Sequence, residues 1–290
     1  MWVVDRPDVN DVDVQLDRAL IRANGEADYE LSADERNAIH QLYAAYDALN
    51  GEPDPSLQPA ALDGCADALK AAYGQVQKGG RLEGLRGKLL ARVLECPACG
   101  YGPGPTLDHH LPKDTYRALS IYPRNLIPTC QVCNRAKGTL QPKAGHGVIH
   151  PYFQELPEGE TFFHADVTYE NGKLTVTFRI DNPALDPALL QRLQFQMGRL
   201  KLNERYPSAI NIFLFSLKPG FMYLKGTADE KERLRTLLLE HADSYDQDMK
   251  PNHWRSALMR GLAACEPFLD DPWTYFARPM IADVLEFSSV

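Results

Sequence analysis

The stretch Cys130-Gln-Val-Cys-Asn-Arg-Ala-Lys137 decides how the centre of this chain folds. It has an upstream counterpart in Cys96-Pro-Ala-Cys99, so four of the six cysteines form two Cys-x-x-Cys pairs. Each pair places two thiolates at the spacing that holds one tetrahedral ion from a tight turn. The 30 residues between the pairs form a segment long enough to close on itself. The four cysteines therefore predict a structural zinc site with no open coordination position.

A redox role is the alternative for either Cys-x-x-Cys pair alone, and the presence of two pairs argues against it. Metal binding supplies folding free energy to small modules, so a zinc ion is expected to anchor the segment between the pairs. Cys65 and Cys265 are single cysteines in apolar helical contexts, and both are predicted to be buried.

Polar residues suited to hydrolysis lie between the cysteine pairs and directly after the second pair. Asp108 precedes His109 and His110, Asn125 follows, and Asn134-Arg-Ala-Lys-Gly138 comes after the last cysteine. A neutral imidazole can accept a proton from water near pH 7. A hard divalent cation prefers the oxygen ligands that Asp and Asn supply. These residue types are compatible with metal-assisted hydrolysis.

The order of these elements over residues 96–138 resembles the HNH endonuclease family. The resemblance implies a ββα-metal fold, in which a short hairpin carries Asp108 and His109 and a helix begins near Cys133. It also implies one catalytic divalent ion, Mg²⁺ or Mn²⁺, between the hairpin and the helix. By position, His109 would be the general base, and Asp108 and Asn134 would bind the ion.

The same resemblance assigns supporting roles to further residues. Asn125 would hold the hairpin in place and orient the catalytic imidazole, while Arg135 and Lys137 would contact phosphate oxygens of nucleic acid. His110 fills a position that varies in the family, so we expect it to be non-catalytic. The third family position is often His and is Asn134 here, which leaves the identity of the ion open.

Each assignment has a structural alternative. Asp108 and Asn134 could cap a turn and a helix, and His109 could be a structural residue. Asn125 could be a turn residue only. Arg135 and Lys137 could belong to a solvated helix face.

The flanks predict an α+β chain of three regions: a helical N-terminal region (1–90), a zinc-stabilised ββα-metal core (91–153) and a mostly helical C-terminal region (154–290) that begins with a β-hairpin. Before the core, a capping box at Ser32-Ala-Asp-Glu35 starts one helix, and two more are expected at about 60–76 and 82–94. Asn171-Gly172 predicts the hairpin turn. Helices should follow from Pro187, at about 229–244 and at about 252–266, while 209–217 is ambiguous between strand and helix.

The charge distribution leaves two interpretations open for residues 78–143: a surface that attracts phosphate, or a chance cluster of basic residues on a solvated face. The chain carries a formal net charge of −8, yet residues 78–143 contain 11 Lys or Arg and 4 Asp or Glu. A local positive potential can attract phosphate to a molecule that is acidic as a whole. The sequence has no apolar run long enough for a membrane span and no signal-peptide pattern, so a cytoplasmic location is expected.

The function expected from these features is metal-dependent cleavage of DNA. The alternative is a zinc-stabilised module that binds nucleic acid or protein without catalysis. Chains with an HNH core and helical flanks resemble nuclease components of bacterial mobile-element and phage-defence systems, and some of those work beside an ATPase. DNA is therefore the expected partner, with an ATPase-like protein or a second copy of the chain as further possibilities.

Overall fold

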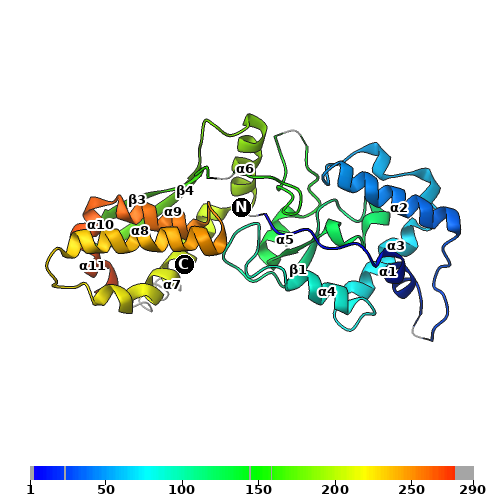
Figure 1. Cartoon of the computed structure of the whole chain (residues 1–290), viewed down its shortest axis with the longest axis horizontal. Coiled ribbons are helices and arrows are strands. Elements are labelled where there is room, and N and C mark those ends of the chain that lie inside the picture. The colour runs from blue at the N-terminus through cyan, green and yellow to red at the C-terminus, as the bar shows by residue number, and fades with distance from the viewer. Residues whose placement is uncertain (1–2, 23, 144, 158, 278–290) are drawn as a thin grey trace, which may run out of the picture. The chain divides into compact units, whose positions relative to one another are not determined.

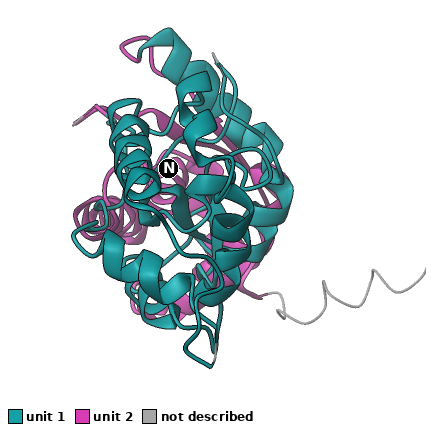
Figure 2. Ribbon diagram, turned by 90° about the vertical axis from the view of Figure 1, so that its right-hand side faces the viewer, with its two compact units in different colours: residues 1–156, 186–200 teal, residues 157–185, 201–290 magenta. Residues whose placement is uncertain are grey.

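The computed structural model describes residues 3–22, 24–143, 145–157 and 159–277, and it has an α+β fold of helices and two small antiparallel sheets (Figure 1). Two compact units make up the chain, and Figure 2 shows them in teal and magenta. Unit 1 contains residues 1–156 and 186–200, and unit 2 contains residues 157–185 and 201–290. None of the helices in the described ranges is both long enough and apolar enough to cross a membrane.

Unit 1 consists of short helices around one small hairpin. Its α-helices and strands are α1 (Val12–Ala19), α2 (Ala33–Ala48), α3 (Ala66–Ala72), α4 (Glu83–Leu90), β1 (Thr106–His109), β2 (Leu126–Thr129), α5 (Gln131–Lys137) and α6 (Pro187–Arg199). Its 3-10 turns are η1 (Pro55–Leu57), η2 (Ala60–Leu62), η3 (Tyr73–Val76), η4 (Arg117–Leu119) and η5 (Pro123–Asn125).

The capping box predicted for α2 is confirmed. The Ser32 hydroxyl accepts a hydrogen bond from the Glu35 amide, and the Glu35 carboxylate accepts one from the Ser32 amide. Two orphan N–H groups of the first turn are thereby satisfied. The apolar side of the helix then buries Tyr43, whose ring stacks on Tyr122 with 4.0 Å between centroids. This contact attaches the N-terminal helices to the loop that follows β1.

The region 60–76 differs from the single helix that its apolar spacing predicts. It forms η2, then α3, then η3, with Gly64 in the first break and Gly74 inside η3. Glycine gains the most backbone entropy on unfolding, so it weakens a helix at both places. Similarly, α4 ends at Leu90 rather than 94, and Gly84 and Gly87 lie within it. The chain can therefore turn into the first cysteine pair.

The centre of unit 1 is the hairpin of β1 and β2 followed by α5. The strands are antiparallel, with Asp108 opposite Ile127 and His109 opposite Leu126. Cys130 is the N-cap of α5, and Gly138, with φ of 59°, ends it. This strand–strand–helix order places the Asp-His pair on the first strand and Asn134 on the helix.

Unit 2 pairs one hairpin with helices. Its elements are β3 (Phe163–Glu170), β4 (Lys173–Ile180), α7 (Leu202–Met222), α8 (Glu230–Met249), α9 (Trp254–Ala263), α10 (Glu266–Asp270) and α11 (Pro272–Ala277). The predicted Asn171-Gly172 turn is confirmed, and both residues have positive φ, at 49° and 75°. The ambiguous stretch 209–217 is helical and lies inside α7.

Close packing of α9 on β3 holds unit 2 together. Gly261 allows it, because a Cβ atom at this position would lie 2.6 Å from the Ala165 carbonyl oxygen. The buried Asn252 side chain accepts hydrogen bonds from the Phe162 and Phe163 amides at the start of β3. The hairpin and the helices therefore form one core.

Candidate functional site

The four paired cysteines come together in unit 1. Their sulfur atoms all lie within 4.8 Å of one another, and all four side chains are buried. A tetrahedral ion with Zn–S bonds of about 2.3 Å would place its sulfur ligands roughly 3.8 Å apart. The 3.9 Å between the sulfur atoms of Cys99 and Cys130 agrees with that spacing. The cluster can therefore hold one zinc ion, with Cys96, Cys99, Cys130 and Cys133 as its ligands.

Backbone hydrogen bonds shape both cysteine turns. The Cys96 amide donates to the Gly102 carbonyl at 2.6 Å, and the Gly100 amide donates back to the Cys96 carbonyl at 2.8 Å. Gly100 has φ of 70°, a conformation that favours glycine. In the second turn, the Cys133 amide donates to the Cys130 sulfur at 3.3 Å. Hydrogen bonds from the neighbouring thiols and from this amide lower the pKa of the Cys130 thiol, which favours the thiolate that binds metal.

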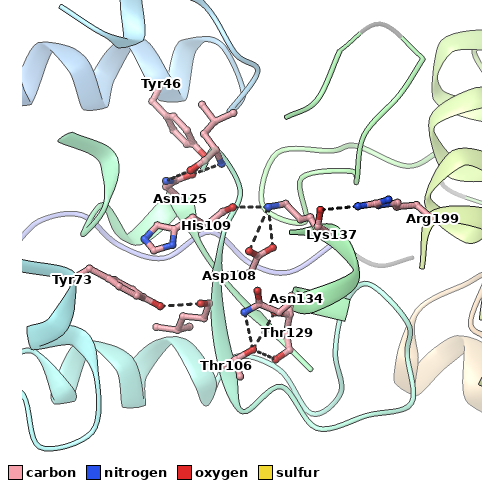
Figure 3. A network of polar contacts seen from close by, with 12 residues as sticks. Tyr46, Tyr73, Thr106, Asp108, His109, Asn125, Thr129, Asn134, Lys137 and Arg199 are labelled. Atoms are coloured by element: carbon pink, nitrogen blue, oxygen red, sulfur yellow. Dashed lines mark hydrogen bonds and ion pairs between the residues drawn. The ribbon is translucent and has the colours of Figure 1, made fainter. Parts of the chain in front are cut away.

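Asp108 is a buried carboxylate that already has a cation beside it. The Lys137 ammonium lies 3.1 Å and 3.4 Å from its two oxygens and also donates to the His109 carbonyl at 2.7 Å (Figure 3). Burial raises the pKa of Asp108 to about 6, and the charge of Lys137 opposes that rise. Lys137 thus stabilises the ionised carboxylate of Asp108, although burial still leaves its pKa above the ordinary value.

Asn134 lies over the same face of β1 as Lys137. Its amide nitrogen donates to the Thr106 hydroxyl at 3.2 Å, and Thr106 precedes Asp108 by two residues on the strand. Residues two apart on a strand share a face, and residues three apart share one side of a helix. The amide of Asn134 and the carboxylate of Asp108 therefore share the face of β1 that α5 covers, as hard oxygen ligands for one cation would.

The neighbouring His109 points to the other face of β1. Its Nε2 lies 2.9 Å from the Ser120 carbonyl oxygen, and its ring packs edge-on against Tyr73 with 4.3 Å between centroids. A carbonyl can only accept, so Nε2 carries the proton and Nδ1 holds the lone pair in the neutral ring. Burial lowers the pKa of His109 to about 4, so the ring is neutral at pH 7. No described residue donates a hydrogen bond to Nδ1.

Asn125 is fully buried, and both the nitrogen and the oxygen of its side-chain amide form hydrogen bonds. Its amide nitrogen donates to the carbonyls of Leu111 and Leu119, and its oxygen accepts from the Leu111 amide and the Tyr46 hydroxyl. Leu119 immediately precedes Ser120, the carbonyl partner of His109. Asn125 therefore ties the loop after β1 to the start of β2, close to the group that orients the imidazole.

Replacing Asn125 with alanine is expected to lower the free energy of unfolding of unit 1 by about 2–3 kcal/mol, because several buried polar groups lose their partners. Urea denaturation followed by circular dichroism and by hydrogen exchange of the unit 1 amides measures the change, since Trp254 and Trp273 lie in unit 2 and would report on that unit. Asn37→Ala is the matched control, since Asn37 is exposed on α2 and should change stability by less than about 0.5 kcal/mol. Equal midpoints for the two variants would contradict the assignment.

His110 and His150 form a buried pair behind the site. Their ring centroids are 4.1 Å apart, and the pKa of each is well below its ordinary value because of burial. His150 accepts from the Tyr152 amide through Nδ1 and contacts the Tyr46 hydroxyl through Nε2 at 2.9 Å. His110 lines a cavity of about 20 Å³ beside Asp108 and Lys137, enough for one water molecule. Both rings lie in the packed interior, and His110 Nε2 has no hydrogen-bond partner among the described residues.

The two predicted phosphate-binding residues are placed differently. Arg135 is exposed on α5, so its contact with phosphate stays a prediction. Lys137 is only 4% exposed and pairs with Asp108 in this structure, a partner that the sequence pattern did not indicate. The spacing of three between Asn134 and Lys137 was the available signal, because it places both on one side of a helix.

Other contacts at the site carried no sequence signal. Tyr73 comes from the end of α3 and touches His109, although 36 residues separate them. Gln196 is fully buried on α6, where it donates to the Ala98 carbonyl beside the first cysteine pair and accepts from the Ile149 amide. Arg199, on the same helix, donates to the Lys137 carbonyl at the end of α5. A helix distant in sequence thus contacts the first cysteine turn and the end of α5.

Comparison with known proteins finds two partial relatives. The chain is 36% identical over 86 residues to the protein ea31 of Escherichia phage lambda, which covers 29% of this chain and 28% of that protein. It is 47% identical over 45 residues to the Septu protein PtuB of Bacillus thuringiensis, 16% of this chain and 17% of that protein. The similarity thus spans less than a third of either relative. No protein-family model and no solved structure matches the chain.

Proposed function

We propose that this chain is a metal-dependent endonuclease of the HNH type that hydrolyses phosphodiester bonds in DNA. The observation that carries the proposal is that the adjacent side chains of Asp108 and His109 have different partners and different charges. One side chain is a buried carboxylate that pairs with a cation, and the other is a neutral imidazole with a fixed tautomer. Both residues belong to β1, which pairs with β2 directly before α5 and the second cysteine pair, and Lys137 of α5 contacts Asp108.

His109 would act as the general base. Its Nδ1 lone pair would take the proton of a water molecule as that water attacks phosphorus. The imidazolium formed in this step keeps its Nε2–H bond to the Ser120 carbonyl, and the bond strengthens as the ring gains charge. Asn125 maintains that geometry, because it fixes the adjacent Leu119 carbonyl.

Asp108 and Asn134 would hold a divalent ion, Mg²⁺ or Mn²⁺. When bound, such an ion neutralises charge on the scissile phosphate and on the leaving oxygen. The residues fit this role, since the Asp108 carboxylate is buried and pairs with an ammonium group, and Asn134 bonds to Thr106, two residues before Asp108 on the same face of β1. Lys137 would have to release Asp108 when the ion binds, and its ammonium could then reach the phosphate.

Replacing Lys137 with methionine tests that competition. We expect Lys137→Met to bind Mn²⁺ about tenfold more tightly, because the ion no longer displaces an ammonium group from Asp108. Without a divalent ion, the same variant should be destabilised by on the order of 3 kcal/mol, since Asp108 is left as an unpaired buried charge. Calorimetric titration and urea denaturation measure the two effects. Weaker Mn²⁺ binding by this variant would contradict the competition.

The proposed activity predicts nicking of supercoiled plasmid by the purified protein with Mg²⁺ or Mn²⁺ and none with EDTA. His109→Ala, purified in parallel, is the matched inactive protein and excludes a contaminating nuclease. If no divalent ion supported nicking, the endonuclease proposal would be rejected, and a zinc-stabilised binding module without catalysis would be favoured.

The alternative is a zinc-stabilised module that binds nucleic acid or protein without catalysis. The Lys137–Asp108 ion pair is the observation in its favour, because an ammonium group occupies the place that the ion would need. Both functions predict bound zinc, so zinc content does not distinguish them.

A role in antiphage defence is the biological setting that we propose. The partial similarity to a Septu protein supports it, and the phage lambda relative is consistent with a mobile-element setting. DNA, an ATPase-like partner and a second copy of this chain remain the proposed partners. Co-purification of the chain with proteins encoded beside its gene tests the protein partner.

A further inference from the structure

Two ion pairs hold the loop after β1 against α3. Asp114 lies 2.7 Å from the Lys70 ammonium, and Arg117 lies 2.8 Å from the Asp67 carboxylate. Both pairs join a loop residue to α3, so the loop is fixed on both sides of its first turn. That turn begins at Pro112, whose carbonyl accepts from the Thr115 and Tyr116 amides.

Lys113 lies in the same turn but has a different partner. Its ammonium stands over the Tyr73 ring, 4.9 Å from the centroid. Among the described residues no carboxylate lies within ion-pair distance of it, because the adjacent Asp114 is engaged by Lys70. Lys113 is half-buried and forms no ion pair with a described residue, although its charge adds to the larger effect of Lys70 in lowering the pKa of the neighbouring Asp114.

Tyr73 links this charge to the proposed base. The same ring that carries the Lys113 ammonium packs against the His109 imidazole, and its hydroxyl donates to the Leu107 carbonyl of β1 at 2.9 Å (Figure 3). The positive charge of Lys113 adds to the effect of burial in lowering the pKa of His109. A fixed cation therefore lies on the face of β1 from which His109 would act.

We propose that Lys113 binds a phosphate group of the DNA strand that lies over His109, and that Tyr73 is the positioning residue that keeps the ammonium there. The inference rests on the proposed endonuclease function. An ammonium group with no protein counter-ion, placed beside a neutral base, is suited to a phosphate oxygen. Lys137 does not take this role in the structure, because its ammonium is buried with Asp108 on the opposite face.

Binding is measured separately from cleavage in the His109→Ala background. A fluorescein-labelled DNA duplex is titrated with protein in Ca²⁺ buffer at several salt concentrations, and anisotropy is recorded. Adding Lys113→Ala is expected to weaken binding about tenfold and to reduce the salt slope by about 0.9, the value for one lost phosphate contact. Lys113→Arg should restore both quantities to within about threefold, since arginine also binds phosphate.

The chain offers a matched control in unit 2. The Lys225 ammonium lies over the Trp273 ring, 5.5 Å from its centroid, in the same kind of contact. Lys225→Ala makes the same change in net charge and should leave affinity and salt slope unchanged. Tyr73→Phe keeps the ring and should retain binding, whereas Tyr73→Leu removes it and should weaken binding several-fold with a smaller change in salt slope.

The outcomes separate the two proposals. If wild-type protein nicks DNA but Lys113→Ala keeps the affinity and salt slope of its parent, the inference about Lys113 is wrong and the endonuclease stands. If wild-type protein neither nicks DNA nor binds the duplex, both proposals are rejected. A loss of binding by Lys225→Ala equal to that of Lys113→Ala also overturns the inference, because the effect would then be one of net charge.

Discussion

Replacing Cys96 with serine is expected to release the zinc ion and to unfold the segment 96–137. The four buried cysteines are placed to share one ion, so the loss of one ligand would open the site to water and weaken the other three bonds. Structural zinc contributes about 10–16 kcal/mol of binding free energy in small modules, which is as large as the whole stability of a typical domain. Zinc content by mass spectrometry and hydrogen exchange over 96–137 measure the two effects.

Cys265→Ser is the control for this prediction, because Cys265 is buried in unit 2 and lies outside the cluster. It should keep one zinc per chain and the exchange protection of the hairpin. Chelation of the wild-type protein should reproduce the Cys96→Ser result. A Cys96→Ser protein with one tightly bound zinc and unchanged protection would disprove the four-cysteine site.

Replacing His109 with alanine is expected to lower the rate of DNA cleavage by about 10²–10⁴-fold, the usual contribution of a positioned general base. Zinc content should stay at one per chain, because the four cysteines supply every ligand that the cluster needs. Divalent-ion affinity should also persist, since Asp108 and Asn134 are intact. Single-turnover cleavage of a labelled duplex at saturating protein isolates the chemical step from binding.

Replacing the adjacent His110 is the control that distinguishes loss of a catalytic base from loss of a buried imidazole ring. His110→Ala removes a side chain that packs on His150 and should lower stability, because it leaves a cavity in the core. Its cleavage rate per folded molecule should remain within a few-fold of wild type. If His110→Ala abolished cleavage and His109→Ala did not, the base would have been assigned to the wrong histidine.

Local sequence patterns predicted several elements because the interactions that form them are themselves local. The Ser32–Glu35 capping box needs only four residues, and the Asn171-Gly172 turn needs only two residues with positive φ. The apolar spacing of 60–76 predicts one helix, but the region is broken, because Gly64 and Gly74 weaken it locally. The stretch 209–217 could not be assigned, because a short apolar run fits a buried strand and a buried helix equally.

The candidate site was likewise predictable from the sequence only in part. The sequence placed the four paired cysteines in one cluster, because two Cys-x-x-Cys pairs at this spacing suit one tetrahedral ion, and the structure brings their sulfur atoms together. It also placed Asp108 and His109 between the two pairs and Asn134 directly after the second pair. Only the tertiary structure decided that Lys137 neutralises Asp108 and that Tyr73 carries Lys113 beside His109. The residues in these contacts are 29 to 40 positions apart in the sequence, and they lie on opposite faces of β1. The contacts therefore depend on how α3 and α5 pack against β1.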